Sequence, residues 1–192
     1  MVNAPFSAER VLGLSALAGP QPDLFEAAEA APMELVVLKE IQELPPGGLL
    51  VLDFGGIRVS SESARQLLRR VLHRLRSGEL EDRFLVLSAL RGSRYNVQVM
   101  LQGEDLVAVE RLAESPGARL IGRPESALQQ TFAALLARPV ATASEIRDVL
   151  GLNSTQAATN RLSALVKAGG ARRIAEQSLE GGGREFVFAA VQ

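Results

Sequence analysis

Cysteine and tryptophan are missing from the 192 residues, and histidine occurs once, as His73. The absence of cysteine excludes disulfide bonds, thiolate catalysis and cysteine-based zinc sites. His73 lies among arginine and leucine without carboxylates at the spacing of a metal site, so we expect a surface residue and no metal.

No apolar run reaches the ~18 residues of a membrane helix. Glu9 precedes the apolar stretch at 11–19, which argues against a signal peptide. We therefore expect a cytoplasmic protein.

Aromatic residues are also scarce, at 4% of the chain, although 47% of the residues are hydrophobic. Alanine, leucine, valine and isoleucine must therefore fill the core. The net charge of −1 excludes a polycation that coats nucleic acid through charge alone. Residues 146–175 nevertheless hold five basic side chains and one acidic side chain, Asp148. A neutral protein with one small basic region is typical of a site-specific binder.

Residues 1–124 show the pattern of an α/β domain with a mostly parallel or mixed sheet. The apolar runs at 49–54 and 84–90 predict strands that are buried on both faces. Between them, apolar residues at steps of three and four predict a helix over 61–77. A short helix over 93–102 and strands over 107–112 and 119–121 complete the alternation. Residues 23–44 have helical character, and Pro45 and Pro46 end that segment.

The segment from Leu52 to Ser63, with its strand, Gly-Gly turn and serine-rich helix start, resembles the signature of STAS-like domains. The resemblance covers about residues 11–124 and implies a fold known from anti-sigma-factor antagonists and from the cytoplasmic ends of sulphate transporters. It implies dimerisation, or binding of a partner protein or a ligand. Phosphorylated antagonists open this helix with Asp-Ser, whereas the corresponding pair here is Ser61-Glu62. We therefore expect no phosphorylation switch, and a capping role for Ser60 or Ser61.

Residues 125–192 predict a second, smaller α+β domain. Ser126 and Gln129 have the spacing of a capping box, as do Thr142 and Glu145. The first box predicts a helix that Pro139 ends, and the second predicts a short helix followed by a turn at 151–153. Asn153 or Ser154 then caps a longer helix that runs to about residue 168. Two helices joined by a three-residue turn with a glycine form a helix-turn-helix unit.

The longer helix divides into an apolar face and a polar, uncharged face. Its apolar residues, such as Leu162 and Leu165, are expected to pack on the preceding helices. Hydroxyl and amide groups on the other face donate and accept hydrogen bonds, as base edges in the major groove require. We predict that these base-reading residues are Thr155, Gln156, Thr159, Asn160 and Ser163.

After this helix, residues 172–175 and 184–191 predict a β-hairpin whose turn is Glu180-Gly181-Gly182-Gly183. Residues 142–188 resemble bacterial winged-helix transcription factors, in which such a hairpin is the wing. The resemblance rests on motifs that include Gly151-Leu152, Ser154-Thr155 and Gly183-Arg184. It implies that Arg184 contacts a phosphate or the minor groove. We predict phosphate or wing contacts from Arg161, Lys167, Arg172, Arg173 and Arg184.

Other patterns favour structural roles. The helix over 61–77 carries five arginines, for which ion pairs on a solvated face are expected (Arg65, Arg69, Arg70, Arg74 and Arg76). Asp53 ends a strand and is expected to pin the following turn. No phosphate-binding loop, nucleophile triad or carboxylate pair is present, so we expect no enzyme and no cofactor.

These patterns predict a transcriptional regulator that binds double-stranded DNA as a homodimer, since a symmetric dimer matches symmetric half-sites. Its STAS-like domain dimerises, or binds a protein or a ligand. The alternative is a protein-interaction or adaptor module of the anti-sigma-factor-antagonist type that does not bind DNA. An enzyme is the weakest of the three hypotheses.

Overall fold

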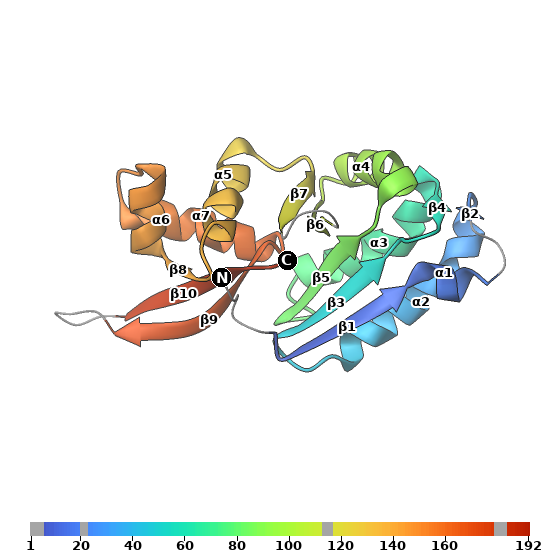
Figure 1. The fold of residues 1–192 in the computed structure, drawn as a ribbon, viewed down its shortest axis with the longest axis horizontal. Coiled ribbons are helices and arrows are strands. Elements are labelled where there is room, and N and C mark those ends of the chain that lie inside the picture. Colours follow the sequence, from blue (N-terminus) through green and yellow to red (C-terminus); the bar gives the residue numbers. More distant parts are fainter. Residues whose placement is uncertain (1–5, 20–22, 113–116, 179–183) are drawn as a thin grey trace.

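The computed structural model describes residues 6–19, 23–112, 117–178 and 184–192. It has an elongated shape, with a five-stranded sheet in one half and a three-stranded sheet in the other (Figure 1). A further pair of very short strands, β2 (Asp23–Leu24) and β4 (Arg58–Val59), lies beside the larger sheet. The chain therefore has an α/β fold with a mixed sheet, which confirms the general α/β class of the prediction.

The larger sheet has the strand order β1-β3-β5-β6-β7. Strands β1 (Ala8–Gly13), β3 (Gly48–Asp53), β5 (Arg83–Ser88) and β6 (Val107–Arg111) are parallel, and β7 (Ala118–Gly122) is antiparallel to β6. The predicted strands β3, β5, β6 and β7 are confirmed within two residues at each end. Strand β1 was not predicted, because its short run carries Glu9 and Arg10 in place of a continuous apolar pattern.

Four helices provide the core on one face of this sheet: α1 (Leu14–Ala18), α2 (Ala27–Glu43), α3 (Ser61–Arg76) and α4 (Arg94–Gly103). The one-turn helix η1 (Arg91–Ser93) leads into α4. Side chains alternate between the two faces of a strand, and Leu50, Leu52, Leu85 and Leu87 point into this first core. The Ser60 hydroxyl accepts a hydrogen bond from the Ser63 amide at 3.1 Å, so the predicted cap is confirmed.

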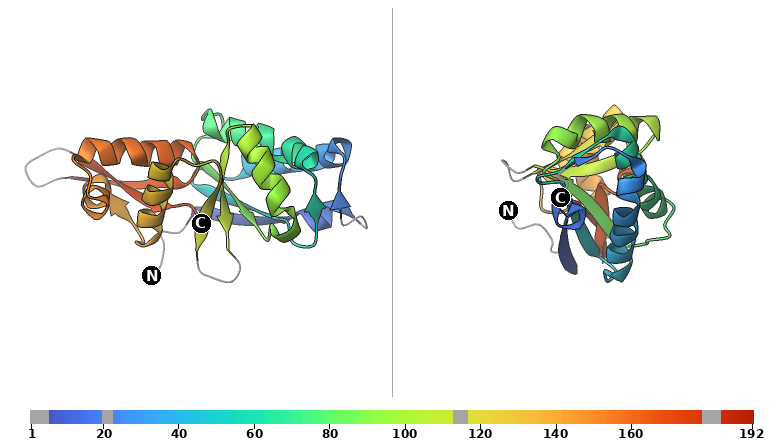
Figure 2. Two further views of the ribbon diagram at one scale, coloured as in Figure 1. Left: turned by 90° about the horizontal axis from the view of Figure 1, so that it is seen from above. Right: turned by 90° about the vertical axis from the view of Figure 1, so that its right-hand side faces the viewer.

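The carboxyl-terminal half follows β7 directly. Its helices are α5 (Ser126–Leu136), α6 (Ala143–Leu150) and α7 (Thr155–Lys167). Its antiparallel sheet has the order β8-β10-β9, with β8 (Ala141–Thr142), β9 (Ala171–Ser178) and β10 (Arg184–Ala190). Strands β9 and β10 project from the end of the molecule (Figures 1 and 2). The predicted turn at 180–183 lies outside the described residues.

The second face of the large sheet belongs to a core that extends into the carboxyl-terminal half. Leu49, Val51 and Val86 are buried in one cluster with residues of α5, α6 and α7, such as Leu135 and Leu165. A shared core of this kind fixes the two halves against each other, since separating them would expose apolar surface on both. The predicted boundary at 124/125 falls between β7 and α5, but the core continues across it.

One predicted capping box does not form. Ser126 is the first helical residue of α5, and Glu125 occupies the N-cap position with φ −58° and ψ 150°. A capping side chain must come from the extended residue before the helix, so the hydroxyl of Ser126 is one residue too late. The Gln129 amide group instead donates to the Pro124 carbonyl oxygen at 3.2 Å. The prediction of the helix itself is confirmed.

Two predicted structural roles are confirmed in the amino-terminal half. The Asp53 carboxylate accepts a hydrogen bond from the Gly55 amide at 2.6 Å and so pins the turn after β3. Arg65 pairs with Glu104 at 2.8 Å, and Arg74 pairs with Glu79, in the turn after α3, at 2.9 Å. These contacts give the arginine stripe a structural role on the surface.

Candidate nucleic-acid interface

The geometry of α6 and α7 is set by local signals in the sequence. The Thr142 amide donates to the Glu145 carboxylate at 2.7 Å, and the Glu145 amide donates to the Thr142 hydroxyl at 3.3 Å. Gly151 has φ 60°, a left-handed conformation that ends α6 at little steric cost. The Ser154 hydroxyl then accepts from the Ala157 amide at 3.1 Å. The predicted second capping box, glycine turn and serine cap are all confirmed.

Helix α7 has a fully buried apolar face, in which Ala158, Leu162 and Leu165 are each 0% exposed. On the opposite side, the Gln156 and Asn160 side chains are exposed to solvent. The Gln156 amide nitrogen donates to the Asn160 side-chain oxygen at 2.9 Å. The other amide hydrogens of this pair, one on Gln156 and two on Asn160, remain available to an outside partner, together with the unused lone pairs of the two oxygens.

The other three predicted reading residues are half-buried. The Thr159 hydroxyl donates to the Thr155 carbonyl oxygen at 3.0 Å, a bond within the helix. The Thr155 hydroxyl accepts from the Arg147 guanidinium at 3.0 Å. Ser163 lies further along the same face, about two helical turns after Thr155. The structure therefore brings all five residues onto one side of α7, with Gln156 and Asn160 as its most exposed members.

Arg147 is a candidate that the sequence reasoning counted as basic but did not assign to the interface. Its guanidinium also pairs with Asp148 at 2.6 Å, and it is anchored beside the first turn of α7. A phosphate near this turn would meet a cation that is already positioned. Arg147 lies eight residues before Thr155 in the sequence. The angle between α6 and α7 makes the two residues neighbours, and the sequence alone does not reveal that angle.

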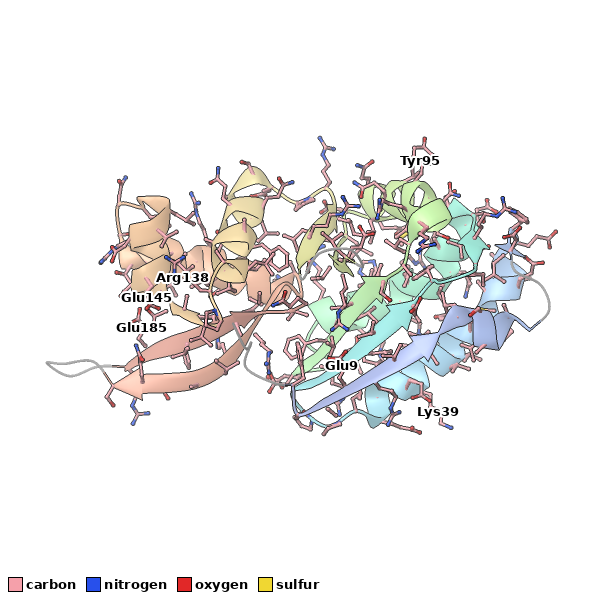
Figure 3. The ribbon with its side chains drawn as sticks, viewed as in Figure 1. Glu9, Lys39, Tyr95, Arg138, Glu145 and Glu185 are labelled. Atoms are coloured by element: carbon pink, nitrogen blue, oxygen red, sulfur yellow. The ribbon has the colours of Figure 1, made fainter. Side chains whose placement is uncertain are left out.

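The amino terminus of α6 is occupied by carboxylates. The Glu185 side chain, from β10, accepts from both the amide and the hydroxyl of Ser144, at 2.8 and 2.9 Å. Figure 3 shows Glu145 and Glu185 in the same region, together with Arg138. Anions favour helix amino termini, and the carboxylates of Glu145 and Glu185 already occupy the amino terminus of α6. Helix α7 differs, because its first turn contains no acidic residue.

Four of the five predicted basic residues are at the surface to differing degrees. Lys167 and Arg173 are exposed, Arg161 is half-buried, and the Arg184 side chain is 73% exposed. Arg184 lies 3.6 Å from the Glu176 carboxylate, and the Arg173 guanidinium stacks 4.6 Å over the Phe186 ring. Lys167 ends α7, about 18 Å along the axis from Thr155 at 1.5 Å per residue. Arg161 and Lys167 therefore lie on α7 itself, whereas Arg173 and Arg184 lie on the β9–β10 hairpin.

Arg172 is placed differently, since it is only 7% exposed and its guanidinium lies 4.0 Å over the ring of Phe6. Burial lowers the pKa of its guanidinium from the ordinary value. The side chain lies at the junction of the two halves, away from the polar face of α7. We therefore leave Arg172 out of the interface, although the sequence alone grouped it with the other four.

Comparison with protein-family models, curated proteins and solved structures finds no match. The geometry of the chain therefore carries the functional argument. Within the described residues, no cluster of three or more histidine or acidic side chains has the arrangement of a metal site. In the same part of the chain, no helix has the length and apolarity needed to cross a bilayer.

Proposed function

We propose that the chain is a transcriptional regulator whose carboxyl-terminal half, a winged helix-turn-helix, binds double-stranded DNA. Helix α7 enters the major groove, and Gln156 and Asn160 read base edges. Both side chains can form bidentate hydrogen bonds with adenine. The observation that carries the proposal is the solvent exposure of this polar, uncharged face at the start of α7.

The position of α7 supports the same interpretation. Its amino-terminal end points away from the large sheet, and α6 and the β9–β10 hairpin lie beside it at that end of the molecule (Figures 1 and 2). A duplex can therefore approach without colliding with the amino-terminal half. The hairpin acts as the wing, where Arg184 contacts the phosphate backbone. Contacts of this type set position, and the base contacts set specificity.

The amino-terminal half is, in this proposal, a STAS-like domain that dimerises the regulator or binds a protein or a ligand. A dimer places two copies of α7 on symmetric half-sites. Each copy of α7 offers a short reading face, so two copies are needed for useful specificity.

A second candidate is an adaptor that binds only proteins. The observation that favours it is an exposed apolar pair on α4, where Tyr95 is 76% and Val99 is 40% exposed, one helical turn apart (Figure 3 labels Tyr95). Exposed aromatic residues are frequent in protein interfaces. The same pair is also compatible with a regulator that has a protein partner, so DNA binding decides between the candidates.

The deciding experiment measures binding of the full chain to a random duplex pool over a range of salt concentrations. Neutralising phosphates releases counterions, so the logarithm of the affinity should fall linearly with log salt. Replacing one phosphate contact, in Arg184→Ala or Arg161→Ala, should weaken all sequences alike and reduce that slope by about 1. Arg69→Ala is the matched control, since Arg69 is an exposed arginine on α3. Salt-independent binding, or equal losses in all three variants, would favour the adaptor.

A further inference from the structure

Strand β1 is an outer strand of the large sheet (Figure 1), and within the described residues it pairs with β3 alone. An outer strand directs backbone N–H and C=O groups away from its sheet, where another strand can bind them. Strand β7 forms the other edge, but the Gln98 side chain bonds both the amide and the carbonyl group of its last residue, Gly122. A further strand can therefore add to the sheet at β1.

The two charged side chains of β1 are both paired within the same chain. Charged side chains on an outer strand commonly prevent its pairing with another molecule. Arg10, on the face of the first core, pairs with Glu40 of α2. Glu9, on the opposite face, lies 2.7 Å from Arg111 of β6 (Figure 3 labels Glu9). These contacts hold both charges against their own protein, so neither charge is left without a partner at the edge.

An apolar side chain at the middle of β1 is open to water. Val11 is 61% exposed, whereas Val51, directly opposite it on β3, is 2% exposed. Val51 belongs to the core that extends into the carboxyl-terminal half, and Val11 does not. Side chains on neighbouring strands contact each other on one face of a sheet. A strand paired with the outer edge of β1 would therefore cover Val11.

The sequence of β1 fits a second copy of itself. In a sheet that continues across a two-fold axis, the axis is perpendicular to the sheet, so opposite residues lie on the same face. The axis then passes between two copies of one residue, and at the middle of β1 this residue is Arg10 or Val11. Two arginines directly opposite each other repel, whereas two valines attract. The Val11 register places Arg10 opposite Leu12. It also places Glu9 opposite Gly13, so no two like charges are directly opposed.

We propose that two copies of the chain associate through antiparallel pairing of β1 with β1, with Val11 opposite Val11 on the two-fold axis. This axis keeps the same face of both sheets on one side. Both carboxyl-terminal halves pack on that face, so they lie on the same side of the dimer, as symmetric DNA half-sites require. The inference rests on the homodimer of the proposed function and adds its surface and register. Its test contains no DNA, so failure of either proposal can be recognised independently.

The first test uses the full chain, which contains no cysteine, so that one substitution places a single thiol at the axis. Opposite residues in antiparallel strands have Cα atoms about 4.5–5.5 Å apart, within the range of about 4.4–6.8 Å that a disulfide bridges. Val11→Cys should therefore form a disulfide-linked dimer on mild oxidation at micromolar concentration. Leu35→Cys is the matched control, since Leu35 on α2 has a similar exposed fraction of 62%. It should cross-link at least about tenfold more slowly, because its thiols meet only by collision.

The second test measures association by analytical ultracentrifugation under reducing conditions. The unmodified chain should show a reversible monomer–dimer equilibrium. Val11→Lys should weaken dimerisation about tenfold, because it replaces an attractive pair on the axis with a repulsive one. Leu35→Lys should leave the equilibrium unchanged. Circular dichroism checks that each variant is folded.

The outcomes separate the surface, the register and the proposed function. A chain that is monomeric at all concentrations, or a dimer that Val11→Lys does not weaken, would overturn the proposal. Equal cross-linking of Val11→Cys and Leu35→Cys would overturn it as well. Faster cross-linking of Arg10→Cys than of Val11→Cys would overturn the register. A β1 dimer that does not bind DNA would overturn the proposed function alone.

Discussion

Gly122, the last residue of β7, holds the connection between the two halves, and its replacement by alanine gives the sharpest stability prediction. Its φ of 106° lies outside the range that side chains ordinarily allow. A Cβ atom built there would lie 2.2 Å from the Leu106 carbonyl oxygen, a backbone atom. The residue is also fixed from the other side, since its amide donates to the Gln98 side chain at 3.0 Å and its carbonyl accepts from it at 2.5 Å.

The expected cost of Gly122→Ala combines two terms. The unfavourable φ contributes about 1–2 kcal/mol, and displacing packed backbone contributes about 1–3 kcal/mol. We therefore expect a loss of about 2–5 kcal/mol in the free energy of unfolding, which is about 4–20 °C in Tm for a chain of this size. Urea denaturation followed by circular dichroism measures it.

Gly103→Ala is the matched control for this experiment. Gly103 ends α4, where a Cβ atom would meet no other atom within 4 Å and the backbone φ is not positive. Alanine there should be neutral or stabilising by up to about 1 kcal/mol, because alanine favours the helix. A loss below about 1 kcal/mol in Gly122→Ala would refute the argument that backbone contact fixes this connection.

Three further predictions concern stability and charge. Ser154→Ala removes the cap of α7 and should cost about 1 kcal/mol in a urea titration; an unchanged midpoint would mean that the cap is dispensable. Arg94→Met removes two hydrogen bonds to the Glu110 carboxylate, which is 1% exposed and keeps Arg119 as a second partner. The free energy of unfolding should fall by about 1–2 kcal/mol. No loss would show that water reaches this carboxylate. The Arg58 guanidinium, hydrogen-bonded to Asp23, holds the pKa of that carboxyl below its ordinary value of 3.8, so Arg58→Ala should raise it toward 3.8 in an NMR titration. The pair therefore stabilises the fold above pH 3.8 and loses this effect as the pH falls through the lowered pKa; an unshifted titration in the variant would contradict the pairing.

Much of the fold follows from local sequence signals. The strands β3 and β5 are continuous apolar runs, and the second capping box, Gly151 and Ser154 fix α6 and α7 through contacts within a few residues. Such features are predictable because the interacting groups are neighbours in the chain. The polar face of α7 was predictable for the same reason, since it depends only on helical periodicity.

The missed features depend on contacts between distant residues. Strand β1 pairs in register with β3, which begins 40 residues further along the chain (Ala8 opposite Gly48), and nothing in its own short sequence reveals this partner. The burial of Arg172 results from Phe6, a residue at the other end of the chain. The failed cap at Ser126 is a shift of one residue, which periodicity cannot resolve. The core shared by the two halves likewise joins residues that are far apart in the chain, such as Leu49 and Leu165.

The most direct test of the proposed function is a fluorescence anisotropy titration of a duplex selected by the full chain, compared with a scrambled duplex. Gln156→Ala and Asn160→Ala should each lose about 1–3 kcal/mol on the selected duplex and little on the scrambled one. Gln130→Ala, an exposed glutamine on α5, should behave as the unmodified protein. Equal affinities of all three variants for the selected duplex would contradict the claim that α7 reads DNA.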